Sequence, residues 1–464
     1  MRDQTQLKYK NDRPDGGRRV RGGLTAASAG AAIAAMAVFG APGTAHAIPA
    51  FAAQTGQPCS ACHIGFPQLT PYGRDFKLEG YVAGGMFPTL KNFAAMVQTG
   101  ETHLNQGIPG GMQPGFRSNN AWAAQQISVF YGGALDARIG LGAFVQVTYD
   151  GIGAAWGWDN TDIRLAHHAD VFGKNLFWGV TLNNNPTVTD LWNTPPSWGF
   201  PYVPSNLAPG PTAGQQVANL GGQVYGIGAY GGMNVTLNDL LYAEADLYKT
   251  LPGHTAYALG VGDGPVADGV IPYVRLALQH QWQNNSVEIG TYALYDRLYA
   301  NGKTGPTNDF FDMAFDSQFQ WITKHQALSV YANYIHESQS YAPGQGLNSA
   351  DTLDSLTFTV SELLYQKIQL IESYNTIYGS ADPGLYSVDT GNANGKPNTN
   401  SWTTEIDYYP FNNGGPAFFP WMNFKLFLED TLYTKFNGRM SNYDGSGRSA
   451  GANNTIYGGI WLVF

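Results

Sequence analysis

The chain has 464 residues and a net charge of −9, and only 13% of its residues are charged. That fraction is about half of what an ordinary soluble domain carries. Because no apolar run after residue 47 is long enough for a membrane-spanning helix, two classes remain, a large soluble β protein and a membrane β-barrel.

Residues 1–47 form the first predicted element. Seven basic residues precede or flank an apolar stretch from Leu24 to Phe39, and the segment ends in the A-x-A sequence Ala45-His46-Ala47. This pattern predicts a secretory signal peptide that is cut after Ala47. The remaining chain has 18 basic and 31 acidic residues and a net charge of −13. No basic stripe is left to neutralise phosphates, so no nucleic-acid partner is expected.

The next element, residues 48–91, holds the only two cysteines of the chain, in the sequence C-S-A-C-H at Cys59–His63. A C-x-x-C pair in an exported protein has three interpretations. A disulfide across so short a loop would stabilise the fold only weakly, and a zinc site would need four ligands where few are near. The immediate C-x-x-C-H order is the attachment signature of c-type haem and is favoured. Cys59 and Cys62 would then form the thioethers of one covalent haem c, and His63 would be the proximal iron ligand.

The residues that follow complete the predicted haem segment. Four bulky side chains are expected to shield the porphyrin, namely Phe66, Pro67, Tyr72 and Phe76. A cationic side chain, Arg74 or Lys77, is expected to pair with the propionates. The distal axial ligand stays open among Met86, Met96, His103 and Met112. A methionine in that position would give a higher redox potential than a second histidine.

Residues 92–464 are predicted to form about sixteen strands, because apolar residues alternate with polar or small ones in many short segments. Examples are 138–149, 241–248 and 274–282. The alternation by itself fits a soluble sandwich as well as a barrel. In a barrel, five carboxylates of the polar face would line a wet interior. The favoured interpretation is that they form a hydrated pore lining, and the alternative is that they bind iron. These are Glu244, Asp246, Glu288, Glu405 and Asp407.

Several segments interrupt the strands. Residues Asn183–Gly214 are too rich in proline for a strand ladder and are predicted to be a long loop, either extracellular or folded inward onto the haem segment. Glycine, asparagine and aspartate predict further long loops at Gly302–Asp309, Tyr341–Asp351, Ser380–Asn400 and Gly438–Asn453.

The C-terminus decides between the two classes. The chain ends T-I-Y-G-G-I-W-L-V-F, with Ile460, Leu462 and the terminal Phe464 on one face, as in the closing strand of bacterial outer-membrane barrels. Together with the signal peptide and the many tyrosines and tryptophans, this predicts a transmembrane antiparallel β-barrel in the outer membrane of a Gram-negative cell. A barrel of this size has an open lumen unless something fills it, so residues 48–91 are predicted to plug the barrel formed by 92–464.

Two stretches resemble the fused monohaem cytochrome-porins, the outer-membrane cytochrome c iron oxidases of iron-oxidising bacteria. The first is Pro49–Tyr81, which contains the C-x-x-C-H motif. The second is D-N-T-D-I-R at Asp159–Arg164, continued by the proline-rich segment Trp178–Tyr202. The resemblance implies a small haem domain, with Cys59, Cys62 and His63 as its haem-binding residues, in the lumen or on the periplasmic side of a barrel of about sixteen strands.

The resemblance also implies a function. The expected activity is that of an oxidoreductase, which takes electrons from extracellular Fe(II) and passes them to a periplasmic electron-carrier cytochrome. Ferric iron precipitates near neutral pH, so moving only the electron inward would leave Fe(III) outside. The alternatives are a porin with a haem plug and an electron conduit for a donor other than iron.

Overall fold

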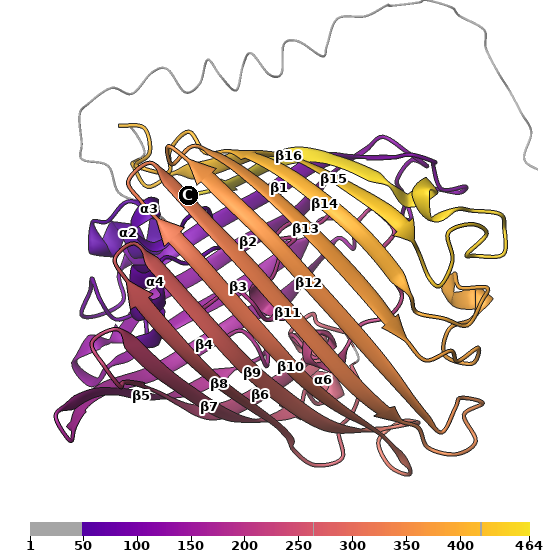
Figure 1. Ribbon diagram of the computed structural model, residues 1–464, viewed down its shortest axis with the longest axis horizontal. Helices are drawn as coiled ribbons and strands as arrows, with labels where there is room; N and C mark the ends of the chain where they lie inside the picture. Colours follow the sequence, from indigo (N-terminus) through magenta and orange to yellow (C-terminus); the bar gives the residue numbers. More distant parts are fainter. Residues whose placement is uncertain (1–48, 263, 418–419) are drawn as a thin grey trace, which may run out of the picture. The chain divides into compact units, whose positions relative to one another are not determined.

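The computed structural model describes residues 49–262, 264–417 and 420–464; the predicted signal peptide lies outside these ranges. The described residues contain a closed barrel of sixteen antiparallel strands (Figure 1). Each strand pairs with its neighbours in the chain, and β1 closes the ring against β16 from Met96–Val463 to Leu104–Thr455. In these ranges no helix is both long enough and apolar enough to cross a membrane. The prediction of about sixteen strands in an antiparallel barrel is confirmed.

The strands have the following bounds: β1 Phe93–Leu104, β2 Ala121–Asp136, β3 Leu141–Asp150, β4 Ala155–Val171, β5 Lys174–Asn183, β6 Val224–Asn234, β7 Asp239–Thr250, β8 Ile271–Trp282, β9 Asn285–Tyr299, β10 Thr307–Ile322, β11 Gln326–Ser340, β12 Ala350–Leu364, β13 Ile368–Gly379, β14 Thr399–Tyr408, β15 Asn423–Lys435 and β16 Thr455–Val463. The helices are α2 Pro49–Thr55, α3 Cys59–Cys62, α4 Pro71–Leu78, α5 Gln216–Asn219 and α6 Gly253–Ala258. Short 3-10 turns are η2 Leu90–Asn92, η3 Ala137–Ile139, η4 Pro196–Trp198, η5 Val388–Thr390 and η6 Ala450–Asn453.

The two faces of each strand follow the alternation of the sequence. On β7, Leu241 and Leu247 are exposed on the outside of the barrel, whereas Glu244 and Asp246 are buried inside it. On β8, Leu276 is exposed and Arg275 is buried. A one-residue shift in pairing would exchange these faces, so the alternation also fixes the register.

The barrel exterior is apolar, with aromatic side chains toward both ends. Exposed leucine, isoleucine and phenylalanine side chains include Leu276, Ile289, Phe315, Phe358 and Leu428. Exposed aromatic side chains stand near one end of the strands at Trp122, Trp156, Tyr225, Tyr378 and Trp402, and near the other end at Phe93, Trp282, Tyr365 and Tyr408. An apolar band between two aromatic girdles is the surface that a lipid bilayer requires of a barrel.

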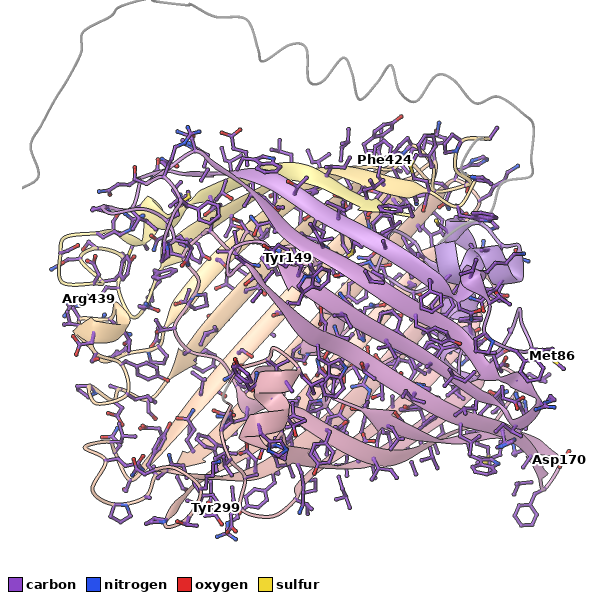
Figure 2. All side chains as sticks on the ribbon, turned by 180° about the vertical axis from the view of Figure 1, so that it is seen from behind. Met86, Tyr149, Asp170, Tyr299, Phe424 and Arg439 are labelled. Carbon is purple, nitrogen blue, oxygen red and sulfur yellow. The ribbon has the colours of Figure 1, made fainter. Side chains whose placement is uncertain are left out.

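The two ends of the barrel differ in their connections. At one end most turns are tight, as at 172–173, where Phe172 and Gly173 have φ of 55° and 73° as a two-residue hairpin turn requires. At the other end most loops are long, as at 184–223 and 380–398. Helices α2, α3 and α4, coloured indigo in Figure 1, lie at the end with tight turns. Figure 2 shows Met86 and Asp170 at this end and Tyr299 and Arg439 at the opposite one.

Two segments of the chain fill much of the barrel interior. We refer to residues 49–92 as the plug and to residues 184–223 as the inner loop. The proline-rich segment of the inner loop folds inward and contacts the plug, since Asn193 Oδ1 accepts a hydrogen bond from Leu69 N at 2.9 Å. All five interior carboxylates singled out in the sequence are buried: Glu244, Asp246, Glu288, Glu405 and Asp407. The expectation that they form a hydrated pore lining is therefore wrong, because the plug and the inner loop occupy the space that water would fill.

Candidate functional site

The two cysteines share one turn of helix. Because α3 is a single turn, Cys59 and Cys62 stand three residues apart and project from the same side. The next helix, α4, begins at the N-cap Thr70, whose side chain accepts a hydrogen bond from Gly73 N. Gly73 allows α4 to lie against α3, since a Cβ atom there would be 2.2 Å from the Cys62 carbonyl oxygen.

His63 directly follows this turn and is held by the backbone around it. Its N–H donates to the Cys59 carbonyl at 2.8 Å, and its Nδ1 lies 3.3 Å from the Pro67 carbonyl oxygen. When Nδ1 carries the proton that this carbonyl accepts, Nε2 keeps a lone pair for a metal. Burial lowers the pKa of His63 to about 4, so the imidazole is neutral at neutral pH, the form that ligates metals.

Burial also keeps the neighbouring thiol protonated. The pKa of Cys62 is raised to about 12, mainly by desolvation and in addition by Cys59. In residues 49–464 apart from 263 and 418–419, no group of three or more His, Cys, Asp or Glu side chains is placed to hold a metal ion.

A cavity of about 440 Å³ lies inside the barrel against the plug, within the range of about 300–1,000 Å³ that is usual for cofactor and ligand sites. Cys59, Cys62 and His63 all line it. Its other walls come from β1 to β4, from β16 and from the inner loop, so segments far apart in the sequence contribute.

The lining of the cavity has an apolar and a polar part. Phe66, Phe76 and Trp461 supply aromatic surface, and the strand wall adds amide side chains and one carboxylate, at Gln98, Gln126, Gln146, Asn160 and Asp159. A flat, largely apolar cofactor with polar substituents, attached through the two sulfurs, fits this donor set. His63 would ligate its iron.

The residues predicted to surround the haem divide into two groups. Phe66, Pro67 and Phe76 line the cavity, as does Lys77. Of the two cationic alternatives only Lys77 lines the cavity, and the prediction for Tyr72 requires correction. Tyr72 does not line the cavity but is exposed on the outer side of α4. Arg74 points away from the cavity and toward β10. Its guanidinium donates to Gln318 and Gln320 at 3.0 and 2.7 Å.

The four candidates for the distal ligand are spread over the whole structure. Met96, on the inner face of β1, lines the cavity and is 4% exposed. Met86 is 56% exposed at the rim of the barrel (Figure 2). His103 is exposed, and its Nδ1 lies 2.7 Å from Asn120 Oδ1. Met112 packs with Leu104 in a cluster at the end with long loops.

The inner loop supplies site residues that the sequence did not identify individually. The Lys77 ammonium donates to the carbonyls of Val188 and Asp190, both at 2.7 Å, and lies 4.9 Å from the ring centroid of Trp198. The Tyr202 hydroxyl accepts a hydrogen bond from Gln68 at 2.6 Å. The run of prolines predicted a loop that could fold onto the haem segment, but it gave no indication of which side chains would meet the plug.

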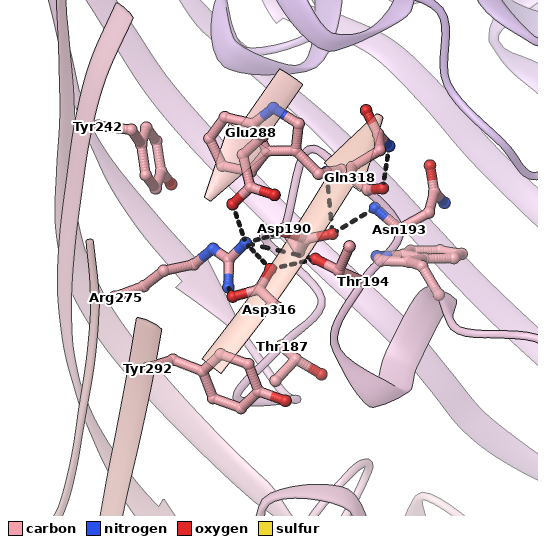
Figure 3. Close-up of polar contacts among 12 residues, drawn as sticks. Thr187, Asp190, Asn193, Thr194, Tyr242, Arg275, Glu288, Tyr292, Asp316 and Gln318 are labelled. Carbon is pink, nitrogen blue, oxygen red and sulfur yellow. Dashed lines mark hydrogen bonds and ion pairs between the residues drawn. The ribbon is translucent and has the colours of Figure 1, made fainter. Parts of the chain in front are cut away.

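Buried ion pairs join the plug, the inner loop and the wall. Figure 3 shows Arg275 of β8 between three carboxylates. Its Nη2 lies 3.1 Å from Asp190 of the inner loop, 3.3 Å from Glu288 and 2.8 Å from Asp316. On the opposite wall, Lys425 contacts Glu405 and Asp407 at 2.5 and 3.2 Å. In the described part of the chain, none of the five predicted interior carboxylates lines the cavity, although Asp190 of the Arg275 group does. The ion pairs support a structural role for Glu288, Glu405 and Asp407.

No protein-family model and no curated protein matches the chain. Solved structures similar to it include the loop L8 deletion mutant of OmpT, an outer membrane protein of Vibrio cholerae, at 9% identity and a TM-score of 0.42, covering 80% of this chain and 97% of that one. Others are the anion-selective porin from Comamonas acidovorans, at 10% identity and 0.43, covering 80% and 98%, and Pseudomonas putida OprB, at 12% identity and 0.42, covering 84% and 96%. The strand pairing described above, rather than these distant similarities, defines the barrel.

Proposed function

We propose that this protein carries electrons across an outer membrane. One haem c, bound covalently to Cys59 and Cys62 with His63 as its proximal ligand, accepts electrons from extracellular Fe(II) and passes them to a periplasmic cytochrome. The observation that carries the proposal is the cavity in the barrel interior, because both cysteines and the histidine of the C-x-x-C-H motif line it together.

The exterior of the barrel supports a membrane location. Its apolar band matches the hydrocarbon core of a bilayer, and its two aromatic girdles match the two membrane–water interfaces. In bacterial outer-membrane barrels the tight turns are periplasmic and the long loops extracellular. The plug lies at the end with tight turns, so the haem segment would be on the periplasmic side of the lumen, within reach of a periplasmic partner.

The filled interior supports transfer of electrons rather than of solutes. A diffusion porin needs a continuous aqueous channel, whereas here the interior side chains are buried against the plug and the inner loop. When bound, the haem supplies an iron centre that can take up and release one electron at a time. Oxidation of each Fe(II) ion to Fe(III) releases one electron, and the ferric ion stays outside.

The described residues have definite tasks in this arrangement. The Pro67 carbonyl orients the His63 imidazole through Nδ1. Phe66, Phe76 and Trp461 give the cavity an apolar wall, and an apolar surrounding favours the less charged ferrous form of a bound haem. Lys77 holds the inner loop over the cavity through two backbone carbonyls.

The proposal is tested with proteoliposomes that enclose an oxidised c-type cytochrome. Anaerobic Fe(II) is added outside, and the enclosed cytochrome is followed by its absorbance. We expect one cytochrome reduced for each Fe(III) formed with the wild-type protein, and none with the double variant C59A/C62A. Rapid passage of small sugars through the wild-type barrel, with no cytochrome reduction by Fe(II), would refute the proposal in favour of a porin. Reduction by a different donor, but not by Fe(II), would refute the assignment of iron.

A further inference from the structure

We propose that Met96 is the distal axial ligand of the haem iron, through its thioether sulfur. This inference rests on the function proposed above and adds to it the second ligand, which the C-x-x-C-H motif does not specify. It is carried by the position of Met96 on the cavity wall and by the contacts that occupy the competing side chains.

The cavity wall offers few atoms that can ligate haem iron. Apart from the motif and Met96, the described lining contains three side chains with a donor atom that commonly ligates haem iron. These are Lys77, Tyr81 and Tyr202. The Lys77 ammonium donates to two carbonyls and would have to lose a proton to ligate a metal. The Tyr81 hydroxyl donates to Asp162 Oδ2 at 2.6 Å.

Tyr202 is disfavoured as a ligand by its hydrogen bond and burial, and the other predicted ligands are excluded by their position. The Tyr202 hydroxyl accepts a hydrogen bond from Gln68 Nε2 at 2.6 Å, and burial raises its pKa well above the ordinary value, which disfavours the phenolate that binds iron. Met86, His103 and Met112 are not part of the lining, as described above. Met96 is therefore the neutral donor that remains.

The environment of Met96 suits a ligand. It belongs to the same buried apolar cluster as Ile64 and Phe66 of the plug and Trp461 of β16, and it lines the same cavity as His63. The strand that holds it is paired on both sides, to Val463 of β16 and to Ser128 of β2, which fixes its backbone. Its flexible side chain can still adjust to a bound group.

One contact of the sulfur is already satisfied by a neighbour two residues along the strand. Gln98 Nε2 lies 3.5 Å from Met96 Sδ, a weak hydrogen bond that uses one of the two sulfur lone pairs and leaves the other. A hydrogen bond of this kind restricts the orientation of the thioether, in the way that neighbouring groups commonly orient metal ligands.

The experiment uses the full chain, purified with its haem attached, and three variants. These are M96L, M96H and the control M112L, which changes a buried methionine outside the cavity. Covalent haem is measured by peroxidase staining after denaturation, barrel folding by the heat-dependent shift in electrophoretic mobility, and ligation by optical and near-infrared magnetic circular dichroism spectra. Redox potentials are measured by titration.

We expect the ferric wild-type protein and M112L to show the far-red sulfur-to-iron charge-transfer band of His/Met ligation. M96L should lose this band and its potential should fall, while covalent haem and barrel folding are retained. M96H should give the near-infrared signature of two imidazoles and a potential below that of the wild type. Haem in a folded wild-type barrel without the sulfur band, or with a band that persists in M96L, overturns this inference but leaves the proposed function standing. A folded wild-type barrel without covalent haem overturns both.

Discussion

Replacing Arg164 with methionine tests how firmly the plug is held in the barrel. Arg164 is fully buried on β4, and its guanidinium donates to three acceptors in three parts of the protein. These are Asp162 Oδ2 of the same strand at 2.8 Å, the carbonyl of Thr189 in the inner loop at 2.8 Å and the carbonyl of Lys77 in the plug at 3.1 Å. Methionine fills much of the same space but donates no hydrogen bond.

The cost of this change follows from the carboxylate that stays behind. Removing one partner of a buried ion pair costs about 3–5 kcal/mol, because the other charge is left uncompensated. Asp162 keeps hydrogen bonds from Tyr81 at 2.6 Å and Thr181 at 2.9 Å, so we expect the lower end of the range. When the plug undocks, water can reach Asp162, and the penalty therefore falls on the docked state. About 3 kcal/mol corresponds to a rise of roughly a hundredfold in the undocked population.

Limited trypsin digestion in detergent micelles measures this population when opening and closing are fast relative to cleavage. Arg74 and Lys77 are buried in the docked plug, so cleavage at either site reports undocking. The matched control is Arg297→Met, which removes the guanidinium of an exposed pair with Asp268 and should leave the rate of cleavage within the plug unchanged. Equal rates for R164M and the wild type would refute the view that this buried arginine anchors the plug.

Three further outcomes are expected. The C59A/C62A variant should lose covalent haem in peroxidase staining but keep the heat-dependent mobility of a closed barrel, and persistent staining would contradict attachment through the cysteines. Lys425→Met should lower the free energy of unfolding in denaturant by about 3–5 kcal/mol. The loss should be much smaller in a variant in which both carboxylates that Lys425 contacts are also neutralised. Equal losses in the two variants would show that the buried charges do not act as a unit. In the haem-free chain, burial lowers the pKa of Lys77 from 10.5 to about 8. Between these two pH values Lys77 is protonated in the unfolded chain but not in the docked plug, so the free energy of unfolding should rise with pH over that window. The K77M variant should show no such rise. Urea midpoints of the wild type that fall with pH over this window would contradict the assigned pKa shift.

The architecture of the wall could be predicted from the sequence because each strand has its own local signal. Leucine and alanine alternate with charged and tyrosine residues along β7, and this period of two specifies both the strand and its outward face. The C-terminal strand carried a similar signal. Loop positions followed from glycine and proline, whose backbone preferences are also local.

The interior could not be predicted in the same way, because it depends on contacts between residues that are hundreds of positions apart. Whether Arg74 or Lys77 faces the cavity depends on the rotation of α4 against the inner loop. The residues next to Arg74 and Lys77 in the sequence do not determine this rotation. The buried carboxylates were expected to meet water, since a polar strand face carries no mark of what covers it. The sequence likewise could not show that Met96, one of four candidates for the distal ligand, shares a buried apolar cluster with Ile64 and Phe66.

The pairing of β1 with β16 has a consequence for biogenesis. It joins residues as far apart in the chain as Met96 and Val463, so its closure has the largest entropic cost of any strand pair in the ring. The plug packs against this seam through Phe66, whose ring centroid lies 4.9 Å from that of Trp461. Because the plug continues directly into β1, closing this seam also brings the plug to the strand that carries Trp461. The cavity beside Cys59 and Cys62 is therefore complete only after the last strand has joined the ring, since Trp461 of β16 forms part of its wall.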